Sequence, residues 1–160
     1  MTGALVALGV LLAATVFGLV RRRRDGVLRA VPGAGGATRD GRKDGDGQVG
    51  EQVDEQVGET LRPDELGAEL GAKATLVQFS SAFCAPCRTT RRVLGEVAGM
   101  VDGVAHVELD AEAHLELVRR LNVVRTPTVL VLDGAGRIVR RAAGAPRKAD
   151  VIAALGAAIP

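Results

Sequence analysis

The chain has 160 residues, of which 47% are hydrophobic but only 2% aromatic, so its core must be built from aliphatic side chains. The length allows one domain of ordinary size together with additional segments. The formal net charge is only +2, although 25% of the residues are charged. This excludes the strongly basic class of proteins, and we expect no nucleic-acid partner.

An apolar stretch runs from Gly3 to Val20 and is broken only by Thr15. As a helix it would span about 27 Å at about 1.5 Å per residue, close to the hydrocarbon thickness of a bilayer. Four arginines at 21–24 follow it directly, whereas a cleaved signal peptide, the main alternative, carries its positive charge before the apolar region. We therefore predict that residues 1–24 form a single-pass cell-membrane anchor with an arginine stop. The arginines favour a cytoplasmic soluble part, with an extracytoplasmic one as the alternative.

Residues 25–60 are dominated by Gly, Asp, Arg and Gln and lack sustained apolar periodicity. Such a segment cannot bury enough apolar surface to offset the entropy lost on ordering. A near-repeat would place Val49, Val53 and Val57 on one helix face, but neighbouring glycines disfavour a stable helix. We predict a flexible linker with a reach on the order of 35 Å.

Residues 61–160 alternate between strand and helix patterns, and we predict that they form the folded domain. Strands are expected over 75–80, 104–109, 128–132 and 137–141, the last two joined by a turn at 133–136. Helices are expected over 64–70, after Cys84, over 111–121 and over 148–158. This order predicts an α/β fold with a central mixed sheet that is flanked by helices on both faces.

Two of these helices carry apolar residues at helical spacing, which are expected to face the sheet. They are Val93, Leu94, Val97, Met100 and Val101 in the helix after Cys84, and Val151, Ile152, Leu155 and Ile159 in the last helix. The charged residues of the first of these helices fall mainly on its other side, and they are Arg88, Arg91, Arg92 and Glu96.

Cys84 and Cys87 are the only cysteines, and they lie between a predicted buried strand and an amphipathic helix. This context favours reversible disulfide chemistry, in which a thiolate is the attacking species. A helix N-terminus lowers the pKa of a thiol through its free N–H groups and its dipole, so Cys84 is expected to attack first. Cys87, one turn deeper, is expected to resolve the mixed disulfide, while Pro86 stiffens the turn between them.

Two other interpretations of the cysteine pair stay open. A zinc site needs two further ligands, and the only histidines, His106 and His114, are separated by seven residues where zinc fingers use about three to five. The second open interpretation is a purely structural disulfide, although so small a ring restricts only a short part of the chain. Redox exchange is the favoured prediction, with no metal and no organic cofactor.

Residues 61–160 resemble the thioredoxin family. As in that family, a strand is followed by an aromatic residue and Cys84-Ala85-Pro86-Cys87, and Thr126-Pro127 precedes a later strand. The resemblance implies a thioredoxin-like fold in which the peptide bond before Pro127 is cis and packs beside the sulfurs. It also implies that Thr126 pairs through its backbone with a substrate chain and that a glycine lies beside the substrate groove. The substrate-binding residues implied by the resemblance are Phe83, Pro86, Thr126, Pro127 and Gly144.

Three positions depart from the family pattern. Phe83 replaces the usual tryptophan, and Ala85 replaces a common glycine. Gln78 stands where thioredoxins often bury an aspartate that relays a proton to the inner thiol, and glutamine does not titrate. The proton of the Cys87 thiol must then be accepted by water or by another residue, or Cys87 has no general base at all. Slower thiol–disulfide exchange is therefore expected. His106 stands near the place of a lysine that accompanies that aspartate.

The combined prediction is a membrane-tethered, thioredoxin-like protein-disulfide reductase. Its expected partners are disulfide-bearing protein substrates and a thioredoxin-reductase-type or other dithiol donor. Facing outward, it would instead act on apocytochromes or exported proteins. The alternative function is a tethered module of the same fold that docks a partner and exchanges thiols little, which the non-titrating Gln78 keeps open.

Overall fold

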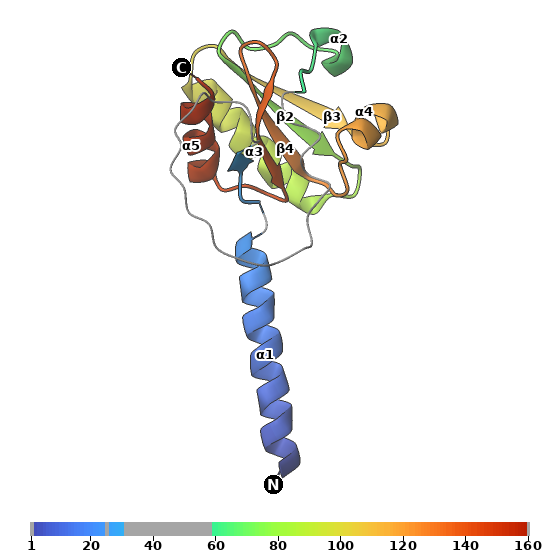
Figure 1. Cartoon of the computed structure of the whole chain (residues 1–160), viewed down its shortest axis with the longest axis vertical. Coiled ribbons are helices and arrows are strands. Elements are labelled where there is room, and N and C mark those ends of the chain that lie inside the picture. The colour runs from blue at the N-terminus through green and yellow to red at the C-terminus, as the bar shows by residue number, and fades with distance from the viewer. Residues whose placement is uncertain (1, 25, 31–58, 160) are drawn as a thin grey trace, which may run out of the picture.

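The computed structural model describes residues 2–24, 26–30 and 59–159 (Figure 1). The helices are α1 (Thr2–Arg24), α2 (Pro63–Leu66), α3 (Ala85–Met100), α4 (Leu115–Arg120) and α5 (Lys148–Ala158). The strands are β1 (Arg29–Ala30), β2 (Ala74–Ser80), β3 (Val104–Asp110), β4 (Thr128–Asp133) and β5 (Ile138–Ala143). From α2 onward the order of elements is the one that the sequence predicts.

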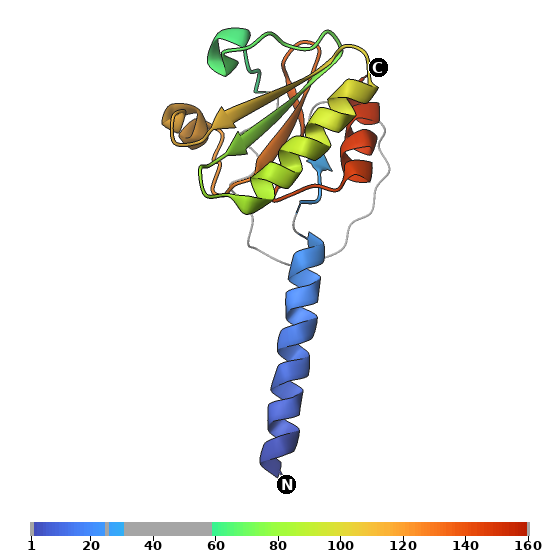
Figure 2. The same cartoon turned by 180° about the vertical axis from the view of Figure 1, so that it is seen from behind.

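The strands form one five-stranded sheet in the order β1-β5-β4-β2-β3. Strands β2 and β3 are parallel, and the other neighbouring pairs are antiparallel. Helices α3 and α5 pack on one face of the sheet, while α2 and α4 lie over the other, as the two opposite views show (Figures 1 and 2). The predicted α/β fold, a mixed sheet with helices on both faces, is confirmed.

Strand β2 lies inside the sheet, between β4 and β3, and leads directly into the cysteine pair. All seven of its residues are buried, as expected for a nearly continuous apolar run that is covered on both faces. Its alternate side chains enter the two separate cores, with Leu76 on the side of α3 and α5, and Phe79 on the side of α2 and α4. The end of a fully buried strand thus holds the cysteines in place.

Two predicted helices are shorter in the structure. Helix α2 ends at Leu66 because Gly67 adopts the left-handed conformation, with φ at 62°, and closes the turn instead of extending it. Helix α4 begins at Leu115, since the residues before it form turns in which Ala113 and His114 donate their N–H groups to the Asp110 carbonyl. Both corrections concern the ends of elements, which local turns decide.

Two residues expected to face the sheet do not. Met100, the last residue of α3, is 63% exposed, and Ile152 in α5 is 43% exposed. In α5 the inner face is set by Val151 and Leu155, which are one helical turn apart and nearly fully buried. Ile152 is displaced from that face by the rotation of about 100° per residue and reaches solvent.

Strand β1 corrects the prediction of a linker over residues 25–60. Arg29 pairs with Arg141 of β5, and Gly26 donates its N–H to the Ala143 carbonyl at 3.1 Å. The strand could not be predicted because pairing at a sheet edge uses backbone groups, which need no apolar pattern in the side chains. The start of the segment therefore belongs to the sheet.

Helix α1 covers the apolar stretch for which the sequence predicts a helix. Among the residues that the structure describes, no helix is both long and apolar enough to cross a membrane. The anchor through residues 3–20 is therefore not confirmed. Residues 31–58, with their near-repeat of valines, lie outside the described part of the chain, and a flexible linker there stays a prediction.

Asp133 closes the hairpin between β4 and β5, and its ionisation should make stability depend on pH. Its carboxylate accepts the N–H groups of Ala135 and Arg137 at 2.9 and 3.0 Å and pairs with the Arg137 guanidinium at 2.8 Å. Burial raises the pKa of Asp133, but these hydrogen bonds and the Arg137 charge outweigh it and hold the pKa below its ordinary value. The stabilisation is thus complete above the unfolded-state pKa and is lost as the pH falls through the folded-state value.

We therefore expect Asp133→Asn to lower the free energy of unfolding by about 1–3 kcal/mol at neutral pH and by less in acid. Urea unfolding of the full chain at both pH values measures the difference. An equal loss at the two pH values would show that the charge of this carboxylate does not matter.

Candidate active site

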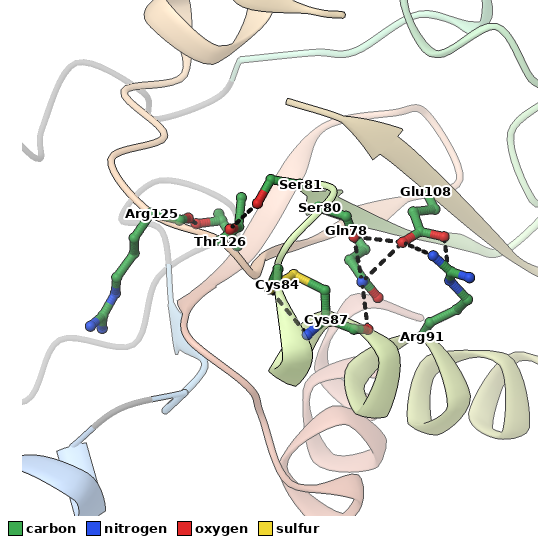
Figure 3. The surroundings of a disulfide bond; sticks show 10 residues. Gln78, Ser80, Ser81, Cys84, Cys87, Arg91, Glu108, Arg125 and Thr126 are labelled. Atoms are coloured by element: carbon green, nitrogen blue, oxygen red, sulfur yellow. Dashed lines mark hydrogen bonds and ion pairs between the residues drawn. A yellow bond between two sulfur atoms is a disulfide. The ribbon is translucent and has the colours of Figure 1, made fainter. Parts of the chain in front are cut away.

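The two cysteines lie at the junction of β2 and α3 and form a disulfide (Figure 3). Their Cα atoms are 5.2 Å apart, as the spacing of one helical turn allows. Cys84 is 9% exposed and Cys87 only 2% exposed. The sulfur predicted to attack is therefore the more accessible of the two, and the predicted resolving sulfur lies deeper.

Cys84 is the N-cap residue of α3, and its side chain acts as the cap. Its sulfur accepts the backbone N–H of Cys87 at 3.1 Å, while Pro86 occupies the first turn, where its missing N–H leaves no donor unpaired. In the reduced protein the same N–H and the positive end of the helix dipole would stabilise a thiolate at Cys84. The chain therefore builds the electrostatic arrangement that the sequence predicts for the attacking cysteine.

A second loop, before β4, lies against the segment that leads to Cys84. The Thr126-Pro127 peptide bond is cis, as the resemblance implies, and Pro127 is buried. Thr126 Oγ1 lies 3.0 Å from Ser81 Oγ, which joins the two loops (Figure 3). Gly144, at a φ of 106°, donates its N–H to the Pro127 carbonyl at 2.7 Å. The structure thus brings Thr126, Pro127 and Gly144 together, although their contact with a substrate stays a prediction.

Phe83 projects from the loop immediately before Cys84 and is 99% exposed. Pro86, on the other side of Cys84, is also exposed. The ring is wholly in solvent and contributes nothing to the core, although it lies beside the disulfide. The predicted binding role of both residues stays a prediction.

Gln78, which stands in the place of a titratable acid, is fully buried behind Cys87. Its Nε2 atom donates to Ser80 Oγ at 2.7 Å, to the Cys87 carbonyl at 3.0 Å and, more weakly, to Glu108 Oε1 at 3.4 Å. Its Oε1 atom is buried and has no hydrogen-bond partner among the described residues. Figure 3 shows this side chain between the cysteine pair and Glu108. Glutamine thus connects the inner cysteine to a carboxylate on the next strand.

Glu108 is the acid of this network, and the sequence does not single it out. It accepts a hydrogen bond from Ser80 Oγ at 2.5 Å and forms an ion pair with Arg91 of α3 at 2.5 Å. Burial raises the pKa of Glu108, but Arg91 and Ser80 outweigh that effect, so the pKa lies below its ordinary value and the group is ionised at neutral pH. The signal that could have found it is the register of β2 and β3, in which Gln78 lies opposite Glu108.

A pocket of about 410 Å³ opens beside the disulfide on this side. Both cysteines line it, together with residues from β2, α3 and β3. The other lining residues are Ser80, Ser81, Ala82, Arg88, Arg91, Glu108 and Asp110. Polar and charged side chains therefore share this pocket with the disulfide.

The family's sequence profile described as Thioredoxin matches residues 59–157, which is more than half of the chain. The chain belongs to the thioredoxin family. It is a thioredoxin-like protein-disulfide oxidoreductase whose active site is the Cys84–Cys87 pair. The thioredoxin domain thus accounts for the fold, the disulfide and the cis peptide bond together.

Known proteins similar to this thioredoxin domain include bacterial thioredoxins. The thioredoxin of Mycolicibacterium smegmatis is 35% identical over 100 residues, which cover 60% of this chain and 85% of the relative. The bifunctional thioredoxin reductase/thioredoxin of Mycobacterium leprae is 33% identical over 89 residues, and the match spans 55% of this chain but only 19% of that protein. Among solved structures, a mutant thioredoxin from Halobacterium salinarum superposes with a TM-score of 0.51 at 18% identity. That match covers 55% of this chain and 76% of the other, and it supports the fold.

The two histidines stand apart from the thioredoxin disulfide. His114 is the N-cap residue of α4, and its Nδ1 atom lies 2.9 Å from the Asp110 carbonyl oxygen. His106, on β3, is half-buried, and burial lowers its pKa. Among the described residues, no group of three or more His, Cys, Asp or Glu side chains is placed to hold a metal ion.

Proposed function

We propose that this thioredoxin domain reduces disulfides in protein substrates. The observation that carries the proposal is Cys84 as the N-cap of α3, with its sulfur accepting the Cys87 N–H. The Cys84 thiolate attacks one sulfur of the substrate, the substrate S–S bond breaks, and one substrate sulfur leaves as a thiolate that takes up a proton. Cys87 then attacks Cys84, which releases the second substrate thiol and closes the Cys84–Cys87 disulfide. Two electrons pass from the dithiol to the substrate.

The residues around the disulfide would hold the substrate during this exchange. The backbone of Thr126, kept in place by the contact between Thr126 and Ser81, would pair with the substrate chain beside Pro127. The exposed ring of Phe83 and the exposed Pro86 would cover apolar parts of the substrate. Gly144 would border the groove, where the absence of a side chain leaves room for a second backbone.

The electron donor would be a thioredoxin-reductase-type protein. The support is the Mycobacterium leprae relative, whose name joins a thioredoxin reductase to a thioredoxin in one protein. No organic cofactor is needed in this chain, because the dithiol itself carries the electrons. NADPH oxidation by a thioredoxin reductase in the presence of this protein and insulin tests the donor, and the absence of any added oxidation would contradict it.

Insulin reduction by the full chain, with dithiothreitol as electron source, tests the proposal. The matched control is the same protein after both thiols have been alkylated. We expect rapid reduction by the untreated protein and only the background rate after alkylation. Equal rates would favour the second candidate function, a module that docks a partner without thiol exchange. The observation that favours this second function is the buried Gln78, which cannot titrate.

We also propose that residues 3–20 attach the protein to the cell membrane as a single-pass anchor, with the thioredoxin domain in the cytoplasm and an extracytoplasmic domain as the alternative. The support is the apolar run and the arginines at 21–24. We expect the full chain to stay with membranes after carbonate extraction and a variant without residues 1–24 to be released. Recovery of the full chain in the soluble fraction would contradict the anchor, and digestion of the domain in intact cells would contradict its orientation.

A further inference from the structure

Cys87 needs a proton acceptor before it can resolve the mixed disulfide. Its side chain is 2% exposed, so bulk water does not reach the sulfur freely, and only its thiolate attacks Cys84. The buried side chain of Gln78 hydrogen-bonds the Cys87 carbonyl but cannot take a proton. The acceptor must therefore come from the pocket beside the sulfurs.

Two carboxylates line that pocket, Glu108 and Asp110. Asp110 is exposed at the end of β3 and accepts the Glu112 N–H at 2.9 Å, which ties it to the following turn. Glu108 is only partly exposed and is joined to Cys87 through Gln78, whose Nε2 atom bonds both the Cys87 carbonyl and Glu108 Oε1. Of the two carboxylates, Glu108 is the one that shares a hydrogen-bond partner, Gln78, with Cys87.

The charges around Glu108 keep it in its ionised form, the form that can accept a proton. Strand β2 contributes only the uncharged Gln78 and Ser80, and α3 contributes two arginines, of which Arg91 is paired with Glu108. On β3 the neighbouring titratable groups are His106, whose pKa is lowered by burial, and Asp110. Among the described residues that line the pocket or act on Glu108, the charged or titratable groups besides the cysteines are Arg88, Arg91, His106, Glu108 and Asp110.

We propose that Glu108 accepts the proton of the Cys87 thiol through a water molecule in the pocket and thereby replaces the acid that Gln78 lacks. The Cys87 S–H bond breaks, the proton passes to Glu108, and the thiolate forms a bond with Cys84 as the bond from Cys84 to the substrate breaks. The departing substrate thiolate recovers a proton from Glu108 or from water. The electron transfer is that of the exchange proposed above, on which this inference rests.

The test separates the two thiol steps with the disulfide reagent DTNB and the reduced full chain. Attack by Cys84 releases a first thionitrobenzoate, and attack by Cys87 on the resulting mixed disulfide releases a second. For Glu108→Gln we expect an unchanged first release and a second release slowed at least about tenfold at neutral pH. We also expect the second rate to climb with pH in the variant, because hydroxide must replace the lost base, whereas the wild-type rate stays nearly flat.

Conservative and neighbouring variants distinguish a proton acceptor from a structural support. Glu108→Asp should restore much of the second release. Arg91→Met removes the ion pair but keeps the carboxylate; because Arg91 holds the Glu108 pKa down, the acid limb of the second-release profile should move to higher pH. The matched control is Glu112→Gln, which removes an exposed carboxylate outside the pocket and should change neither rate.

Three results would overturn the inference. They are an unchanged second release in Glu108→Gln, an equal slowing of both releases with an unchanged pH profile, and a larger selective effect of Asp110→Asn. A wild-type protein that releases neither thionitrobenzoate would instead contradict the proposed function, so the two failures are distinguishable.

Discussion

Replacing Cys84 by serine should lower the rate of insulin reduction by about 1000-fold or more, because an attacking residue that forms the covalent intermediate has no substitute. Cys87 does not replace it, since its side chain is 2% exposed and cannot approach a protein disulfide. The measurement is the initial rate with excess dithiothreitol, corrected for the rate of dithiothreitol alone.

The control for this variant is its fold. The disulfide closes a ring of four residues and contributes about 2 kcal/mol by restricting the unfolded chain, so Cys84→Ser must be compared with the reduced wild type. We expect similar unfolding midpoints for those two proteins. A folded Cys84→Ser protein that retains the wild-type rate would contradict the assignment of the attacking sulfur.

Replacing Cys87 by serine should stop the reaction halfway and leave the substrate bound to Cys84. The outer sulfur keeps the dipole of α3 and can still attack, but no inner thiolate is present to release the adduct. Mass spectrometry of the variant after mixing with an oxidised protein substrate should show one covalent adduct per chain, which dithiothreitol removes. In cells, the same adduct would identify the natural partner.

The matched control for trapping is the double variant Cys84→Ser/Cys87→Ser, which should form no adduct. The yield of the covalent adduct should also depend on Thr126, because the backbone of this residue is proposed to hold the substrate chain. Equal adduct on the double variant, or an adduct located at a residue other than Cys84, would contradict the proposed order of attack and resolution.

The central parts of the fold could be predicted from the sequence because their signals are strong and local. Helix α5 spans the predicted residues 148–158, and the apolar run over 75–80 is indeed the buried interior strand β2. The ends of α2 and α4 could not be predicted as well, because a left-handed Gly67 and turns onto Asp110 end or delay the helices. Strand β1 was missed since it depends on an open edge of β5 and on backbone pairing.

Some residues of the active site could likewise be predicted from the sequence, and one could not. The two cysteines, and the two loop residues Thr126 and Pro127, lie in motifs that are contiguous in the chain. The structure joins the cysteines in a disulfide and places Thr126 against Ser81, in the loop before Cys84. Glu108 belongs to no contiguous motif; it lies opposite Gln78 and lines the pocket beside the disulfide because β3 pairs with β2 in one particular register. From the sequence alone, such a residue cannot be distinguished from any other charged residue in a strand, because its role depends on the strand register.

Alkylation of the reduced full chain across a pH series tests the central claim most directly. The rate of iodoacetamide labelling at Cys84, followed by peptide mass spectrometry, reports the fraction of thiolate at that residue. The cap formed by the Cys87 N–H and the dipole of α3 predicts a labelling midpoint below the value of about 8.5 for a free cysteine. A midpoint at the free-cysteine value, or labelling of Cys87 ahead of Cys84, would contradict the account.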